Sequence, residues 1–164
     1  MERTELFSQI DKTVSELLDQ VFYLDASKIN TVPYENSWTA AQLLRHITRS
    51  TLSMTKAMDA PQKDPGRAAD ARAAELEKIF LDTSNRFNAP EFIIPEDVTY
   101  EKEHSMQELR NAFHKLKEKA NGTELNSLVE GMILGPVTKL EILYFSLYHT
   151  QRHLRQMKKI IAAL

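Results

Sequence analysis

Apolar residues recur at intervals of three and four along much of this chain, and this spacing constrains the fold more than any other feature. Residues at these positions share one face of an α-helix, which then packs against a core. Near the start of the chain the apolar stripe consists of Leu6, Ile10, Val14, Leu17, Val21 and Leu24. We therefore expect an amphipathic helix over about residues 3–24.

Three further segments carry the same spacing. One begins after Trp38 and extends to about Met58, a second covers about residues 105–120 and ends near Gly122, and the last covers about residues 138–161. Leu, Lys, Glu, Gln and Ala predominate and only four glycines occur, which favours helix over strand. Four long amphipathic helices predict an all-α fold, a four-helix bundle.

Two capping boxes mark where two of these helices begin. Thr39 is followed at the third position by Gln42, and Thr138 is followed in the same way by Glu141. In this motif each side chain pairs with a backbone N–H that the first turn of a helix leaves without a partner. Gly135 and the proline after it would interrupt a helix, so we expect the last helix to begin near Thr138.

The connections between the predicted helices are less regular. Prolines and a glycine in residues 59–69 predict a break, and residues 69–84 are expected to form a solvated helix or an irregular excursion outside the core. We expect an irregular loop over residues 85–101, with its apolar patch Phe92–Ile94 packed against the bundle. Residues 123–134 are predicted to form a short helix that leads into the last one.

Composition and charge exclude several classes of protein. The chain has 164 residues, of which 42% are hydrophobic and 27% charged, and this predicts one soluble globular domain over residues 1–164. A formal charge of -2 without a basic stripe argues against nucleic acid or an acidic membrane as a partner. We find no apolar segment of signal-peptide or membrane-spanning length, so a cytoplasmic protein is expected. The absence of cysteine excludes disulfides, thiolate metal ligands and a cysteine nucleophile.

His149 and His153 form the one arrangement in the sequence that points directly to chemistry. They stand at positions i and i+4 of the predicted last helix, where Cβ atoms are about 5–6 Å apart and both imidazoles can reach one metal ion. A solvated or capping pair has the same spacing, and two imidazoles alone would hold a metal loosely. A third ligand is therefore needed. His46, in the second turn of the helix after Trp38, is the best candidate, although a lone histidine there is also typical of a packing residue.

Together these features resemble the DinB/YfiT-like superfamily over nearly the whole chain. The matching residues are Trp38, Thr39, Gln42, His46 and Ile47, followed by Gly135, Pro136, Val137, Thr138, His149, His153 and Met157. The resemblance implies an up-down-down-up bundle with one divalent metal ion held by His46, His149 and His153. Gln42 stands where many relatives have an acidic residue. We interpret this difference as one of helix capping, because glutamine completes a capping box equally well.

Three neutral imidazoles with an open fourth position are typical of a catalytic metal. Zn²⁺ and Ni²⁺ suit imidazole best, with Fe²⁺ and Mn²⁺ as alternatives. The resemblance implies a transferase in which the metal activates a low-molecular-weight thiol, of the bacillithiol or mycothiol type, for attack on an electrophile. A metal-dependent hydrolase that activates water, or a non-catalytic stress protein that binds metal or a small molecule, remains an alternative.

The sequence offers little more about the reaction. No Asp or Glu lies at helical spacing from the three histidines on the same face, so a general base is not indicated. Ser146 and Gln156 are candidates to support the ligands or to contact a substrate. A homodimer is an expectation from the resemblance alone, since no apolar stripe exceeds what the core requires.

Overall fold

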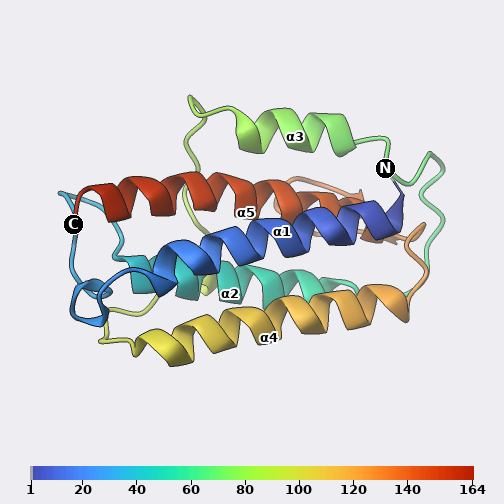
Figure 1. Ribbon diagram of the computed structural model, residues 1–164. Coiled ribbons are helices and arrows are strands. Elements are labelled where there is room, and N and C mark those ends of the chain that lie inside the picture. The colour runs from blue at the N-terminus through green and yellow to red at the C-terminus, as the bar shows by residue number, and fades with distance from the viewer. Residues whose placement is uncertain (1) are drawn as a thin grey trace.

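The structure is a computed structural model that describes residues 2–164, and four long helices form its bundle (Figure 1). These helices are α1 (Arg3–Phe22), α2 (Ala40–Ala57), α4 (Lys102–Asn121) and α5 (Lys139–Ala162). The predicted all-α bundle is therefore confirmed. None of the helices within residues 2–164 is both long and apolar enough to cross a membrane.

The four bundle helices follow the up-down-down-up order. In Figure 1, α1 and α5 run toward the end of the molecule where the C-terminus lies, whereas α2 and α4 run the opposite way. α2 packs mainly on α4, and α5 packs on α1, α2 and the additional helix α3 (Ala73–Leu81). Because α2 and α5 are antiparallel neighbours, the first half of α2 lies beside the second half of α5.

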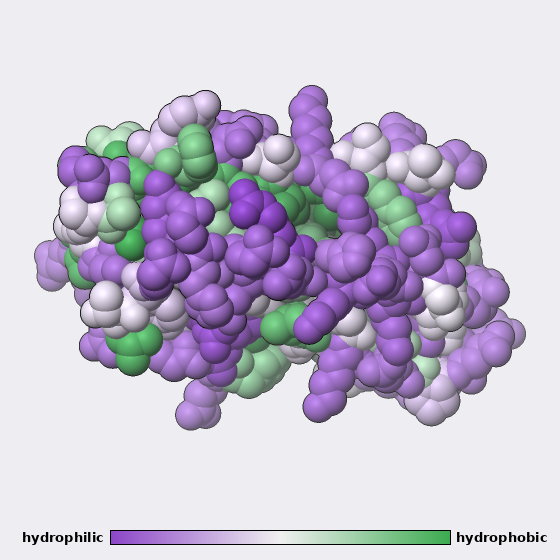
Figure 2. Space-filling view, turned by 60° about the horizontal axis from the view of Figure 1, so that its bottom comes forward, coloured by the Kyte–Doolittle hydropathy of each residue, from purple (hydrophilic) through white to green (hydrophobic). Residues whose placement is uncertain are grey.

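The predicted apolar stripes meet in one core. Each fully buried leucine or isoleucine contributes about 1.5–3 kcal/mol relative to an exposed position. The side chains that are at most 1% exposed include Leu6, Ile10, Leu17, Val21, Leu43, Leu44, Ile47, Leu109, Leu116, Ile142, Leu143, Leu147, Met157 and Ile160. Hydrophilic residues cover most of the face drawn in Figure 2, and the hydrophobic residues that show there form separate patches among them. The helices therefore turn their apolar sides inward, as the periodicity predicts.

α4 begins three positions earlier than the expected Ser105. The side chain of Glu101 accepts hydrogen bonds from the backbone N–H groups of Glu103 (3.0 Å) and His104 (2.6 Å), and so caps a first turn that begins at Lys102. A glutamate in this role lies outside the usual set of capping residues. The apolar stripe alone gives no sign of this extra turn, because its residues are exposed or only partly buried.

The prediction of a short helix over residues 123–134 is wrong. This part of the chain contains β1 (Leu128–Val129), which pairs antiparallel with β2 (Val137–Thr138). Gly131 and Gly135, in the connection between the two strands, have φ values of 77° and 80°. This left-handed conformation suits glycine and ends helical structure, so the apolar residues pack from a hairpin and not from a helix.

α3 is the predicted excursion outside the bundle, but it is not solvated on all sides. Its Leu76 and Phe80 are buried, and the helix lies along α5 on the side away from α4 (Figure 1). As a result α5 is covered by three helices, α1, α2 and α3. This explains why polar side chains such as Ser146, His149 and Thr150 are buried on it.

Both predicted capping boxes form. At the start of α5, Thr138 Oγ1 accepts from the N–H of Glu141 (3.0 Å), and Glu141 Oε2 accepts from the N–H of Thr138 (2.8 Å). Glu141 is fully buried and also accepts two hydrogen bonds of 2.6 Å from the guanidinium of Arg67. Burial alone would raise the pKa of Glu141, but the hydrogen bonds from Arg67 and from the backbone of Thr138 and Arg72 lower it. The connection between α2 and α3 is thereby fixed to the start of α5.

Two single-turn 3-10 helices lie in the connections, η1 (Ala26–Lys28) before α2 and η2 (Glu91–Ile93) before α4. We refer to residues 85–101, which contain η2, as the strap. Only the middle residue of its apolar patch packs as predicted: Ile93 is 8% exposed, whereas Phe92 and Ile94 are 56% and 44% exposed.

Candidate metal centre

His46, His149 and His153 converge between α2 and α5. One ring nitrogen from each lies within 4.8 Å of the others. The Nε2 atom of His153 is 3.1 Å from Nε2 of His46 and 3.0 Å from Nε2 of His149. All three side chains are buried, with exposed fractions of 3%, 6% and 8%. The structure thus brings together the three residues that sequence and resemblance single out.

The strap orients His46. Nδ1 of this ring lies 3.1 Å from the carbonyl oxygen of Ile93, and a carbonyl can only accept, so Nδ1 carries the proton and donates. Trp38 packs on the ring with a centroid separation of 4.8 Å. With Nδ1 held by the strap, the lone pair of Nε2 points toward α5.

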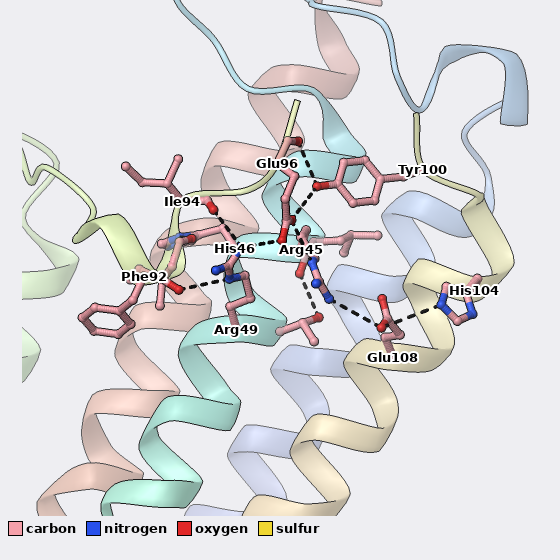
Figure 3. Close-up of polar contacts among 12 residues, drawn as sticks. Arg45, His46, Arg49, Phe92, Ile94, Glu96, Tyr100, His104 and Glu108 are labelled. Atoms are coloured by element: carbon pink, nitrogen blue, oxygen red, sulfur yellow. Dashed lines mark hydrogen bonds and ion pairs between the residues drawn. The ribbon is translucent and has the colours of Figure 1, made fainter. Parts of the chain in front are cut away.

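Two arginines on α2 hold the strap in place (Figure 3). Arg49 donates to the carbonyl oxygens of Phe92 (3.0 Å) and Ile94 (3.1 Å), on both sides of Ile93. Its guanidinium also contacts Glu96 at 2.7 Å, and Arg45 contacts the same carboxylate at 3.2 Å. Hydrogen bonds from the side chain of Arg45, from the backbone and from Tyr100 lower the pKa of Glu96 to about 2. Glu96 therefore stays ionised and bridges both arginines.

Gln156 and Ser146, the candidates to support the ligands or to contact a substrate, differ in their contacts. The Gln156 amide oxygen lies 2.9 Å from Nδ1 of His153, which donates to it. The hydroxyl of Ser146 is buried without a hydrogen-bond partner among residues 2–164. The Nδ1 atom of His149 is likewise buried without a partner in the described part of the chain.

The protonation of the three rings decides whether they can bind a metal ion. A neutral imidazole has one N–H and one nitrogen lone pair. Because Nδ1 of both His46 and His153 donates a hydrogen bond, Nε2 of both rings carries a lone pair, and the two lone pairs face each other across 3.1 Å. That arrangement is favourable only with a cation between them.

A proton is a poor candidate for that cation at neutral pH. Burial lowers the pKa of His46, and it lowers the pKa of His149 well below the ordinary value of 6.5. Burial, aided by the nearby ring of His46, lowers the pKa of His153 to about 3. All three rings are therefore neutral at neutral pH. Nitrogen ligands about 2.0–2.1 Å from a tetrahedral Zn²⁺ lie about 3.3 Å apart, close to the 3.0 and 3.1 Å separations in two of the three pairs. The triad fits a divalent metal ion.

A cavity of about 950 Å³ opens above the three histidines. Trp38, Phe80 and Phe145 are among its apolar lining residues, and within residues 2–164 no Asp or Glu lines it. Neither the sequence nor the lining of this cavity indicates a carboxylate as a general base. Such a pocket leaves one side of the triad open to a small molecule.

Fold and site together define a helical bundle protein with a buried three-histidine centre of the kind that binds a metal ion. The sequence model of the DinB superfamily matches residues 9–157 of this chain, and the chain belongs to this superfamily. The resemblance recognised from the sequence motifs is thus confirmed.

Solved structures agree with this fold. A four-helix bundle protein, TT2238, superposes with a TM-score of 0.63 at 14% identity, over 95% of this chain and 98% of that one. A conserved protein from Enterococcus faecalis gives 0.68, also at 14% identity, over 99% of this chain and 97% of that one. A search of curated proteins found no match.

Proposed function

We propose that this protein is a metal-dependent transferase that binds one divalent ion, Zn²⁺ or Ni²⁺ in preference to Fe²⁺ or Mn²⁺, through His46, His149 and His153. The observation that carries the proposal is the convergence of three buried, neutral imidazoles whose Nε2 atoms lie 3.0 and 3.1 Å apart in two pairs. A bound ion would supply Lewis acidity that lowers the pKa of a thiol at its open position.

The residues around the triad favour a thiol as the nucleophile. The chain has no cysteine, so the thiol comes from a low-molecular-weight cosubstrate of the bacillithiol type. A thiol loses its proton more readily than water and needs less help from a general base. A cavity without a lining carboxylate therefore suits thiol transfer better than hydrolysis. The aromatic side chains of Trp38, Phe80 and Phe145 give the cavity an apolar lining.

The first test is elemental analysis of the protein purified without an affinity tag, alongside His149→Ala. We expect about one Zn or Ni per chain in the parent and a loss of most of it in the variant, because two imidazoles bind weakly. His114→Ala is the matched control, since His114 is exposed on α4 and does not line the cavity at the triad, and this variant should keep its metal. A parent that stays free of metal after incubation with Zn²⁺ and Ni²⁺ would show the proposal to be wrong.

A second test separates transfer from hydrolysis. The metal-loaded protein is given bacillithiol and a haloarene electrophile, and thiol consumption is followed. Metal-dependent conjugation that His149→Ala lacks is the expected result. Release of halide without thiol consumption would identify a hydrolase, and retention of metal with neither reaction would favour a binding protein.

A further inference from the structure

One wall of the cavity above the histidines is strongly basic. Arg86, Arg152, Arg155 and Lys159 all line it, and within the described residues no carboxylate does. The chain as a whole has more acidic than basic residues, 23 against 21. The overall composition does not explain this local concentration of positive charge. We call the four side chains Arg86, Arg152, Arg155 and Lys159 the basic wall.

Within residues 2–164 the charges of the basic wall make no ion pair with a carboxylate. Among these residues Arg152 donates to backbone carbonyls alone, those of Phe80 (3.3 Å), Asp82 (3.1 Å) and Asn85 (2.6 Å). Arg155 donates to another carbonyl, that of Leu81, at 2.9 Å. These bonds position the two guanidinium groups and leave their positive charge unpaired.

Arg86 and Lys159 make no ion pair with any carboxylate in residues 2–164. The nearby carboxylate of Asp82 is directed elsewhere, because its Oδ1 accepts from the N–H and the hydroxyl of Ser84 at 2.8 and 2.7 Å. By contrast Lys158, next to Lys159 on α5, pairs with Glu16 at 2.6 Å. Unpaired positive charge is thus a property of the side of α5 that faces the cavity.

Four positive side chains are thus gathered at one cavity. Like charges gathered at the mouth of a pocket raise the local concentration of oppositely charged ligands. Arginine in particular matches the geometry of carboxylate and phosphate groups.

The same cavity offers an apolar surface next to the basic wall. Phe87 stacks on Phe80 with ring centroids 5.5 Å apart, and the guanidinium carbon of Arg152 lies 4.9 Å from the Phe87 centroid. Phe87 and Phe92 are also 46% and 56% exposed, and both line the cavity. A ligand that covered them would remove apolar area from water while it met the positive charges.

We propose that the cavity binds a small organic anion with an apolar body. Its carboxylate or phosphate group lies against Arg86, Arg152, Arg155 and Lys159, its apolar part lies on the phenylalanines, and its reacting atom reaches the three histidines. The last statement rests on the proposed function, because it takes the histidine centre as the place of reaction. The binding of the anion does not, and it is tested separately.

The test uses two charge-matched double variants of the full chain. Arg86→Gln with Lys159→Gln removes two charges from the basic wall without breaking a hydrogen bond seen within residues 2–164. Arg110→Gln with Lys115→Gln removes two exposed charges from α4, outside the cavity, and changes the net charge equally. Neither pair belongs to the candidate metal ligands, and circular dichroism checks that each variant is folded.

The probes differ only in their charged group. 8-Anilinonaphthalene-1-sulfonate carries an anionic group on an apolar body, and N-phenyl-1-naphthylamine is the same body without it. Fluorescence titration gives the affinity of both. The wall variant should bind the sulfonate probe at least about fivefold more weakly than the parent, and the α4 variant less than about twofold more weakly, at low salt. The neutral probe should bind all three proteins alike.

Any of three outcomes would overturn the proposal. The sulfonate probe could bind both variants with equal affinity, the neutral probe could lose as much affinity for the wall variant as the sulfonate probe does, or the sulfonate probe could fail to bind the parent. Displacement of the sulfonate probe by benzoate, phenyl phosphate and benzamide then ranks carboxylate and phosphate against a neutral group of similar size. Weakest displacement by benzamide is expected. Displacement by benzamide as strong as by the two anions would also count against the proposal.

Metal analysis of the same samples separates this inference from the proposed function. The wall variant should keep its metal, and His149→Ala should keep its preference for the sulfonate probe. If the parent binds no metal but its affinity for the sulfonate probe depends on the wall charges, the anion site stands and the proposed metal-dependent function is wrong. If the parent binds metal but its affinity for the probe does not depend on those charges, only the proposed anion site is wrong.

Discussion

Nδ1 of His46 donates a 3.1 Å hydrogen bond to the carbonyl oxygen of Ile93, so a candidate ligand on a helix is oriented by an irregular segment. One helix sets the spacing of the other two histidines, and Gln156 on that same helix orients the ring of His153. The geometry of the centre therefore depends on how firmly the strap is held. This dependence leads to the first two predictions.

Arg49→Gln should weaken metal binding although it removes no ligand. The substitution removes the bonds to the carbonyls of Phe92 and Ile94, which flank the carbonyl that orients His46. Loss of a residue that orients a ligand costs about 10–100-fold in metal affinity, and we expect the lower end because Ile93 itself remains. Competition with a chelator measures the affinity, with Arg110→Gln as the control. Unchanged affinity would mean that the strap does not position His46.

Glu96→Gln should destabilise the protein in a pH-dependent way. The pKa of Glu96 is lowered from 4.5 to about 2, so its contribution to stability is fully present above 4.5 and is lost as the pH falls through about 2. Its side chain is 45% exposed, and solvent screening limits the loss at pH 7 to about 0.5–1 kcal/mol. Urea unfolding at pH 7 and pH 3 measures the difference from the parent. It should be smaller at pH 3, and a constant or growing difference would contradict the assignment.

Glu141→Gln should be far more damaging than the loss of a surface carboxylate. Glu141 is fully buried and accepts from both terminal guanidinium nitrogens of Arg67, whose side chain is 26% exposed, so the substitution leaves a partly buried positive charge without its partner. We expect a loss of about 2–4 kcal/mol in the free energy of unfolding. Glu16→Gln, which breaks the exposed pair with Lys158, is the matched control and should cost less than about 1 kcal/mol. Similar losses in the two variants would show that Glu141 is not buried as described.

Ser146→Ala should stabilise the protein. The hydroxyl of Ser146 is buried without a partner within residues 2–164, and alanine removes that cost and has the higher helix propensity. A gain of about 0.5–1 kcal/mol in thermal or urea unfolding is expected. Ser105→Ala provides the contrast, because the buried Ser105 hydroxyl donates to the carbonyl of Glu101 at 2.8 Å, and its loss should destabilise. If Ser146→Ala instead loses stability together with metal, the hydroxyl supports the centre after all.

Local patterns carried the prediction of the helices and of the triad. Apolar spacing indicates the four bundle helices, and the pairs Thr39 with Gln42 and Thr138 with Glu141 mark two of their starts. His149 and His153 share a helix face by spacing alone. His46 required the resemblance to a family, because no local pattern relates α2 to α5.

What the sequence did not reveal depends on contacts between distant segments. The pairing of Glu96 with Arg45 and Arg49 joins an aperiodic loop to a helix, and nothing in either segment indicates its partner. The basic wall has the same origin. Arg86 lies in the strap and Lys159 near the end of α5, so the chain shows scattered charges where the fold gathers them.

The cover of α5 by α1, α2 and α3 has a consequence for exchange of the proposed metal ion. We expect amides in the middle of α5 to become accessible to solvent only when the whole bundle opens, so that His149 and His153 are displaced only in rare global unfolding. The strap is fixed mainly by two partly buried arginines on α2 that pair with its exposed Glu96, and it should open at a much lower free-energy cost. Entry and release of the proposed ion should therefore follow the local opening of the strap. His46, whose ring the strap orients, should be the first of the three histidines to dissociate from it.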